Sequence, residues 1–217
     1  MEMSVSFRKD VNMYQPKRYQ KNDSAYFKDF ITAHPFATLV IQGERLLATH
    51  IPVLIDDSKP EIILFGHIAN FNEQLNYLKE NAEVLLIFQG ANGYVSSSWY
   101  KEKDISTWDY SAVHVNAKIR LQTSSELESS LEKLVNHFEK KQENPLFYND
   151  IPSDMLKEHL PLITGFWCEP FKIEGVAKLH QSYAEEDVQS SIEHLAKCPS
   201  TVQLSKDIKK EHDRNNT

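Results

Sequence analysis

The stretch "FATLVIQGERLLATHIPVLI" (residues 36–55) contains two runs of aliphatic and β-branched residues, separated by Gln42, Gly43 and Glu44. Such residues favour strands, and glycine accepts the positive φ that tight turns need. The pattern therefore predicts a β-hairpin. Working outward from it, we expect a mostly antiparallel β protein.

More segments of the strand type follow this hairpin. Residues 113–122 alternate between apolar and polar side chains, and residues 163–176 are expected to form a last strand. Asn92 and Gly93 form one of the strongest short hairpin signals, so we expect residues 84–100 to be two strands around them.

The helical segments are marked by apolar spacing and capping residues. Residues 124–141 give the clearest helix, with Ser125 and Glu128 resembling a capping box. Shorter helices are expected over residues 23–34, after Asn70 with Asn70 or Asn72 as cap, from Ser153, and around Val188, Ile192 and Leu195.

Together these elements indicate an α+β protein, mostly β, in which antiparallel strands form a barrel with peripheral helices. No Gly-x-Gly-x-x-Gly occurs, which argues against a dinucleotide-binding Rossmann unit. One domain is the simplest account. Residues 201–217 mix charges of both signs and are expected to form a polar, solvated C-terminal tail.

Composition is that of an ordinary globular protein, with 41% hydrophobic and 25% charged residues among 217. No apolar run approaches the roughly 18 residues of a membrane-spanning helix, so we expect no membrane partner. The first twelve residues lack the apolar core of a signal peptide. We therefore expect a cytoplasmic protein. A formal net charge of -7 disfavours a DNA partner.

Metal and catalytic motifs are not evident. Cys168 is expected to be buried and Cys198 to lie in a loop, and the nine His residues form no ligand pattern for zinc. The serines of "VSSSWY" (residues 95–100) lack a Gly-x-Ser-x-Gly elbow. We assign no metal site and no catalytic residue.

The stretch "LFGHIANFNEQL" (residues 64–75) is the best candidate for a site. A strand here runs through His67, Asn70 and Asn72 into an expected helix start. Side-chain amides and free backbone N–H groups at such a junction can hold an anion. The same residues also fit a plain capped turn.

A second candidate is the aromatic stretch "SSSWYKEKDISTWDYSAVH" (residues 96–114). It places Trp99, Tyr100, Trp108 and Tyr110 close together in sequence. These rings can be core packing, an interface, or a platform for a flat ligand.

The sequence resembles the PaiB-type proteins, a family of negative transcriptional regulators built on the FMN-binding split β-barrel of the pyridoxamine phosphate oxidases. The resemblance covers most of the chain and rests on motifs that occur in this order: "MYQPKRY", "HPFATLV", "ATHIPVLI", "GHIANFNEQ", "VLLIFQGANGYVSSSWY", "STWDYSAVH" and "TGFWCEPFKIEGVAKLHQ". Residues 1–12 then look like an N-terminal extension before a barrel domain at residues 13–200.

The resemblance implies a homodimeric flavoprotein that holds FMN at the subunit interface. The residues that would run beside the isoalloxazine are Thr49, His50 and Ile51. The residues that would hold the ribityl phosphate are His67, Asn70, Asn72 and Gln74. The residues that would close the pocket are Trp99, Trp108 and Tyr110.

Departures from the family pattern bear on the cofactor. The family commonly has Asn-Pro where this chain has Asn72-Glu73, and Asn-Tyr where it has Asp109-Tyr110. Both changes add a carboxylate near the expected phosphate, and residues 66–75 contain no Arg or Lys. These departures imply that FMN binding is weakened or lost.

The alternatives for function therefore stay open. The resemblance implies a transcriptional regulator that senses a flavin or another small molecule. An FMN-dependent oxidoreductase or flavin reductase fits the same barrel, with His50 or His67 as first candidates for proton donation. A flavin-free dimeric binding module is the remaining reading.

Overall fold

The computed structural model describes residues 13–215, so the expected extension at residues 1–12 lies outside the described residues. The described residues group into two compact units rather than a single one. The larger unit comprises residues 23–89 and 113–173, and the smaller unit comprises residues 13–22, 90–112 and 174–215. The domain limits expected from the sequence stay predictions.

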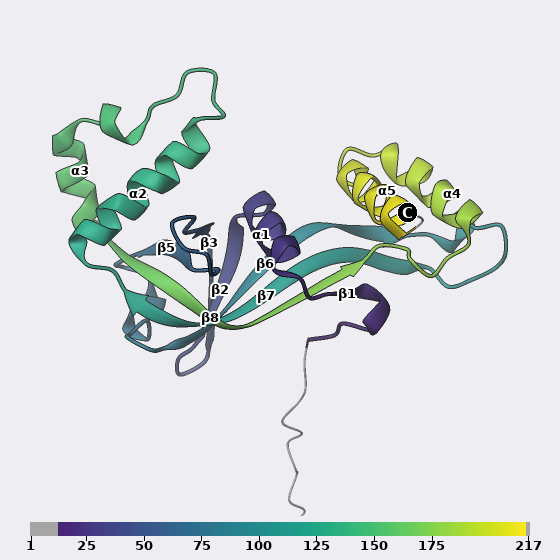
Figure 1. Ribbon diagram of the computed structural model, residues 1–217, viewed down its shortest axis with the longest axis horizontal. Coiled ribbons are helices and arrows are strands. Elements are labelled where there is room, and N and C mark those ends of the chain that lie inside the picture. The colour runs from purple at the N-terminus through teal and green to yellow at the C-terminus, as the bar shows by residue number, and fades with distance from the viewer. Residues whose placement is uncertain (1–12, 216–217) are drawn as a thin grey trace, which may run out of the picture. The chain divides into compact units, whose positions relative to one another are not determined.

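The strands join into one antiparallel sheet of eight strands, in the order β3-β2-β6-β7-β8-β5-β4, with β1 paired to β8 (Figure 1). The strands are β1 Gln20–Lys21, β2 Phe36–Gln42, β3 Leu46–Pro52, β4 Leu54–Ile55, β5 Leu64–Ala69, β6 Glu83–Val95, β7 Thr107–Leu121 and β8 Ile163–Lys178. The expected antiparallel split barrel with peripheral helices is confirmed.

The helices lie outside the sheet. They are α1 Ser24–Ala33, α2 Ser124–Glu139, α3 Ser153–His159, α4 Glu185–Ala196 and α5 Val202–Asn215. Short 3-10 turns are η1 Lys17–Tyr19, η2 Glu73–Asn76, η3 Ser97–Trp99, η4 Tyr148–Asp150 and η5 Leu160–Leu162. In the described part of the chain, no helix has the length and apolar character needed to cross a membrane.

The hairpin expected at residues 36–55 is confirmed. Strands β2 and β3 pair from Phe36 with Pro52 to Gln42 with Leu46. Ala37, Leu39 and Ile41 of β2 alternate with more exposed residues and point into the core of the larger unit. That alternation is the reason the hydrophobic pattern fixes the register of this pair.

The hairpin expected at Asn92 and Gly93 is wrong. Strand β6 runs unbroken through both residues, and no glycine among residues 13–215 has a positive φ. A Cβ on Gly93 would lie 3.1 Å from Leu204 Cδ2 and 3.2 Å from Thr201 Cγ2. Glycine therefore serves here to let α5 pack closely on the strand.

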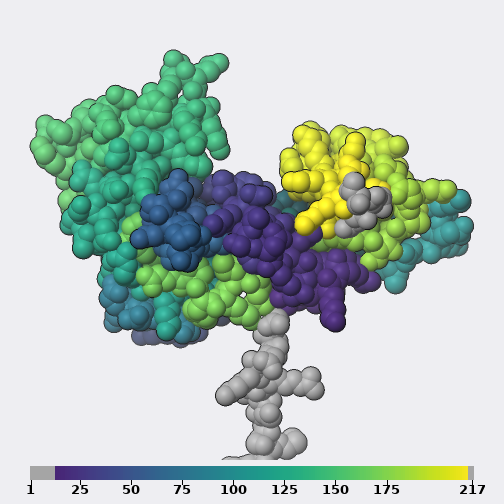
Figure 2. All heavy atoms as spheres, viewed as in Figure 1, coloured from purple at the N-terminus to yellow at the C-terminus, as the bar shows by residue number. Residues whose placement is uncertain are grey.

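The C-terminal segment is folded, so the expectation of a solvated tail is wrong for the described residues up to 215. Leu204, Ile208 and Glu211 are spaced as one face of α5, and all three are buried. Glu211 accepts a hydrogen bond from the buried Lys21 Nζ at 2.6 Å. Helices α4 and α5 lie side by side (Figure 1), their buried side chains belong to one core cluster, and their spheres adjoin in Figure 2.

The clearest expected helix, α2, is confirmed, but its capping residues are shifted. Thr123 lies outside the helix, and its Oγ1 accepts from the Glu126 N–H while the Glu126 carboxylate accepts from the Thr123 N–H. The capping box is therefore Thr123 and Glu126 rather than Ser125 and Glu128. Both pairs have the required spacing, and the point where β7 ends selects the first.

The cysteines lie as expected, with Cys168 buried in the core and Cys198 exposed. Burial raises the pKa of the Cys168 thiol, which keeps it protonated and inert.

Candidate flavin site and buried histidine network

The turn that follows β5 is shorter than the sequence suggested. Instead of a helix, residues 73–76 form the single 3-10 turn η2, capped by Asn72, whose Oδ1 accepts from the Gln74 N–H at 2.9 Å. The chain then leaves the helical path, and Asn81 adopts a φ of 62°. A turn of this length has no helix dipole to offer an anion, so this part of the phosphate hypothesis is wrong.

The amide of Asn72 ties the turn to the hairpin. Its Nδ2 donates to Thr49 Oγ1 at 2.9 Å, and Thr49 lies on β3. This contact joins two residues that the resemblance assigns to different parts of the flavin, and Asn72 uses both polar atoms of its side chain within the protein.

The other predicted phosphate amides are also used internally. Asn70 Nδ2 donates to the Pro161 carbonyl at 2.8 Å, and Asn70 Oδ1 accepts from Thr164 Oγ1 at 2.6 Å. Gln74 is 1% exposed, and its Nε2 donates to the Leu39 carbonyl at 3.1 Å. These hydrogen bonds hold the turn against β8 and the core, with Gln74 buried and Asn70 exposed.

The remaining predicted residues of the larger unit differ in exposure. The Ile51 side chain is buried, whereas His50 is exposed and stacks on Phe36 with ring centroids 6.0 Å apart. His67 is half-buried on β5, and its burial lowers the pKa of the imidazole. His67 is therefore neutral at pH 7 and offers a hydrogen bond without a charge.

Arg45 is a residue that the sequence reasoning missed. It lies in the β2–β3 turn, and its guanidinium donates to both carboxylate oxygens of Glu73 at 2.6 Å. The hydrogen bond from Arg45 holds the pKa of Glu73 below its ordinary range. Contacts thus connect Arg45 through Glu73 and Asn72 to Thr49. The available sequence signal was a cation, Arg45, at the tip of the predicted hairpin.

The predicted aromatic residues lie in the smaller unit, and they do not gather into one wall. Trp99 stacks on His194 of α4, with ring centroids 4.9 Å apart. Tyr110 packs in a small cluster with Tyr19. Trp108 is 55% exposed, and its Nε1 donates to Asn92 Oδ1 at 3.2 Å.

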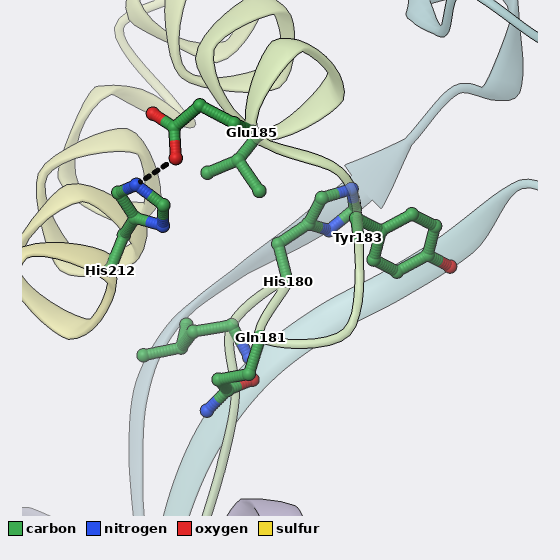
Figure 3. A pocket seen from close by; sticks show the side chains of 7 residues that line it. His180, Gln181, Tyr183, Glu185 and His212 are labelled. Atoms are coloured by element: carbon green, nitrogen blue, oxygen red, sulfur yellow. Dashed lines mark hydrogen bonds and ion pairs between the residues drawn. The ribbon is translucent and has the colours of Figure 1, made fainter. Parts of the chain in front are cut away.

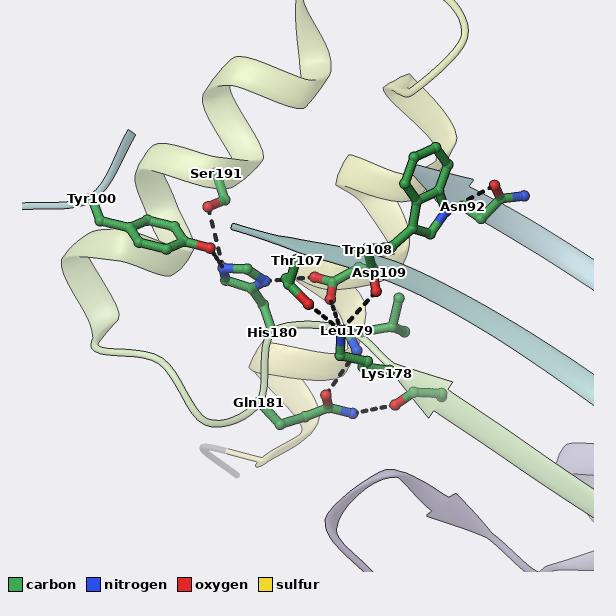
Figure 4. A network of polar contacts seen from close by, with 11 residues as sticks. Asn92, Tyr100, Thr107, Trp108, Asp109, Lys178, Leu179, His180, Gln181 and Ser191 are labelled. Atoms are coloured by element: carbon green, nitrogen blue, oxygen red, sulfur yellow. Dashed lines mark hydrogen bonds and ion pairs between the residues drawn. The ribbon is translucent and has the colours of Figure 1, made fainter. Parts of the chain in front are cut away.

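A buried network in the smaller unit centres on His180, which the sequence reasoning did not single out (Figure 4). His180 Nδ1 lies 2.5 Å from Asp109 Oδ2, and both side chains are almost fully buried. The Tyr100 hydroxyl lies 3.0 Å from His180 Nε2, and Ser191 Oγ lies 3.4 Å from it. Burial raises the pKa of Tyr100, so the phenol stays protonated.

Lys178 compensates the buried carboxylate of Asp109. Its Nζ lies 3.7 Å from Asp109 Oδ1 and also donates to Thr107 Oγ1 and to the Trp108 carbonyl (Figure 4). A carboxylate removed from water requires such partners. The charge that Asp109 adds to the sequence is therefore balanced within the smaller unit.

A pocket of about 190 Å³ lies beside this network (Figure 3). The Tyr183 ring, which lines it, stacks on His180 with centroids 3.9 Å apart. Glu185 Oε2 accepts from His212 Nε2 at 2.7 Å across its rim. The volume is below the roughly 300 Å³ of usual small-molecule sites, and no group of three or more potential metal ligands occurs among the described residues.

The fold is that of the flavin-binding split-barrel proteins. It is similar to the FAD and heme binding protein from Mycobacterium smegmatis, with a TM-score of 0.59 and 14% identity, over 79% of this chain and 80% of that one. It is also similar to the flavocytochrome Anf3 from Azotobacter vinelandii, with a TM-score of 0.58 and 12% identity, over 82% of this chain and 78% of that one. Likenesses at such low identity concern the fold alone.

Sequence comparison identifies the family. Residues 13–169 match the family described as "Putative FMN-binding domain". The chain is also 30% identical to "Protease synthase and sporulation protein PAI 2" of Bacillus subtilis, over 84% of this chain and 89% of that protein. The chain belongs to this family of FMN-binding-domain proteins, and the resemblance noted from the motifs is confirmed.

The site fits a flavin in one respect and departs from it in another. The amides expected to hold the phosphate are committed to internal hydrogen bonds. Arg45, in contrast, reaches this turn from the β2–β3 turn with a guanidinium, and its partner Glu73 is exposed. A bidentate guanidinium suits a phosphate better than an amide does.

Proposed function

We propose that this protein binds a flavin nucleotide, FMN in the first place, at β3 and the turn after β5, and that it works as a flavin-dependent redox protein. The observation that carries the proposal is the position of β3. It is the last strand of the sheet order and pairs with β2 alone among the described strands. Half of its backbone N–H and C=O groups therefore remain available to the polar edge of a planar ring.

Different groups around β3 would bind different parts of the flavin. Backbone groups of Thr49, His50 and Ile51 would face the ring edge. The Thr49 oxygen accepts from Asn72, so the Thr49 hydroxyl hydrogen remains free to donate. Arg45 would hold the phosphate by exchanging Glu73 for it, because exposed ion pairs add little to stability and are easily replaced.

A bound flavin supplies the redox chemistry, while the protein supplies binding, orientation and proton control. His67 is half-buried on β5, where burial lowers its pKa, and its neutral imidazole would donate or accept a hydrogen bond beside the flavin. Family membership over residues 13–169 supports the flavin, and FMN rather than FAD is chosen from the family's description.

The test is a titration of the purified protein with FMN, FAD and riboflavin, followed by quenching of flavin fluorescence. Arg45→Ala is expected to weaken FMN binding roughly tenfold and to leave riboflavin binding unchanged, since riboflavin lacks the phosphate. Arg120→Ala, which breaks another exposed ion pair of the same unit, is the matched control. Bleaching of the bound flavin by a reduced nicotinamide would support the redox role.

The absence of quenching at micromolar protein would overturn the proposal and leave the flavin-free binding module. Equal loss of FMN and riboflavin in Arg45→Ala would remove Arg45 from the phosphate site.

A homodimer belongs to this proposal. The resemblance implies that two copies share the flavin, and the larger unit exposes large apolar side chains at Phe36, Leu46 and Phe71, which are 65%, 71% and 91% exposed. Burial of such side chains against a second copy would remove apolar surface from water. Light scattering during the FMN titration is expected to give twice the mass of one chain.

A regulatory role is the second candidate. The relative from Bacillus subtilis carries a name that refers to protease synthesis and sporulation, which favours regulation of some kind. In this reading the bound flavin would act as an effector rather than as a redox group.

A further inference from the structure

A larger pocket, of about 620 Å³, lies in the larger unit between α1, the β4–β5 pair and α2. This volume falls within the range of about 300–1,000 Å³ that is typical of small-molecule sites. None of the flavin-site residues expected from the sequence lines it. The pocket is therefore a feature that the proposed flavin site does not use.

The wall of the pocket combines an apolar floor with a basic rim. The floor is formed by Ile31, Leu54, Ile55 and Phe65. The rim carries Lys28, Lys59, Lys133 and Lys140. This concentration of positive charge stands out in a chain with a formal net charge of -7.

The rim lysines are only partly compensated. Lys133 Nζ donates to Asp56 Oδ1 at 2.9 Å, and Lys28 Nζ donates to the Pro60 carbonyl at 2.8 Å. Asp56 does not line the pocket, whereas Asp57 does and adds one negative charge to the lining. Within residues 13–215, no hydrogen bond or ion pair holds the ammonium groups of Lys59 and Lys140, so both charges are available to a ligand.

A polar atom of the lining lacks a partner as well. His137 Nε2 is buried and makes no hydrogen bond within the described residues. Burial and the nearby Lys140 and Lys141 lower the pKa of this imidazole. A buried polar atom without a partner costs free energy, which a ligand that bonds to it would recover.

We propose that this pocket binds a small molecule that joins an anionic head, a carboxylate or a phosphate, to an apolar body. The head would lie on Lys59 and Lys140, and the body on Ile55 and Phe65. Charge-assisted hydrogen bonds from lysine would supply specificity for the head, and burial of the body would supply much of the affinity. The site goes beyond the proposed flavin function, because it takes a second ligand as substrate or effector.

The test uses 1-anilinonaphthalene-8-sulfonate, an anionic aromatic probe, and the neutral N-phenyl-1-naphthylamine. The double variant Lys59→Ala/Lys140→Ala is expected to weaken the anionic probe roughly tenfold. The control Lys79→Ala/Lys118→Ala removes the same charge from exposed positions of the same unit outside the lining and is expected to leave the affinity within about twofold.

Thr32→Trp fills the pocket from α1 without a change of charge, and Thr32 is exposed, so the protein should fold. It is expected to abolish binding of the anionic probe while the thermal midpoint stays near that of the parent. Octanoate and octyl phosphate are expected to displace the probe, and octanol is not. Whichever of the two compounds displaces the probe at the lower concentration identifies the head group as a carboxylate or a phosphate.

Equal affinity of the two double variants for the anionic probe would overturn the proposal. So would binding of the neutral probe to the parent protein as tightly as the anionic probe, because the lysines would then add nothing to recognition of the head. Displacement by FMN that Arg45→Ala does not alter would show that the pocket is the flavin's own site, and this would overturn the claim of a second ligand. A failed FMN titration with intact binding of the anionic probe would affect the flavin proposal alone.

Discussion

Two carboxylates distinguish this chain from the family pattern, and the effect of each depends on the single cation that it contacts. The sequence suggested that Glu73 and Asp109 would oppose a bound phosphate. In the structure each of them meets a cation of its own unit, Arg45 for Glu73 and Lys178 for Asp109. Asp109 is buried and has a structural role, whereas Glu73 is exposed and occupies the guanidinium that a phosphate would need.

Glu73→Gln is therefore expected to tighten FMN binding by roughly threefold to tenfold, because it releases Arg45 from a competing charge. The measurement is the same quenching titration. Glu83→Gln removes one negative charge from an exposed position of the same unit and serves as control. If both variants bind FMN like the parent protein, Glu73 does not restrain Arg45.

At the scale of the element, α5 shows how a segment with many charges can still belong to the core. Leu204 and Ile208 are fully buried and lie one turn apart. They pack with residues of α4 and of strands β6 and β8 within the smaller unit. Gly93 provides the room for this contact. The Asn92–Gly93 pair, which resembles a hairpin turn in the sequence, therefore lies inside a strand.

Leu204→Ala is expected to lower the free energy of unfolding by about 2–5 kcal/mol, the usual cost of a buried leucine. Lys206→Ala, on the exposed side of the same helix, is expected to change it by less than about 0.5 kcal/mol. Chemical denaturation followed by circular dichroism measures both. A Leu204→Ala variant as stable as the Lys206→Ala variant would mean that α5 adds nothing to the folded unit.

For the whole molecule, charge sets the limits of any regulatory role. A net charge of -7 repels the phosphate backbone of DNA. The lysines that do gather lie around a pocket with an apolar floor, which suits a small ligand better than a duplex.

We therefore expect no shift of duplex DNA from the protein's own upstream region in a mobility assay at physiological salt and micromolar protein. A regulatory role would then act through a partner protein or through the bound flavin. A shift that disappears as salt is raised would instead show direct binding through phosphate contacts, and it would contradict this expectation.

Much of the architecture could be predicted from local patterns. The alternation of β2 and the spacing of Leu127 and its neighbours in α2 are repeated over several residues, so they do not depend on distant contacts. The capping box of α2 shows the limit of such predictions, since the pairs Thr123–Glu126 and Ser125–Glu128 both have the required spacing.

The candidate site could be predicted only in part. The motifs named both Thr49 and Asn72 as site residues, and the structure adds the hydrogen bond that joins them. They could not show that the amides of Asn70 and Gln74 donate to the carbonyls of Pro161 and Leu39, because those partners are distant in sequence. Nor could they place Arg45 on Glu73, or His180 on Asp109.

The sequence by itself determined most strands, most helices and the family, since periodicity and ordered motifs are properties of neighbouring residues. Only the tertiary structure decided the role of Gly93, the burial of α5 and the partners of each polar side chain. A hydrogen bond or a close packing contact joins residues far apart in the chain, and no local pattern records which partner a donor will meet.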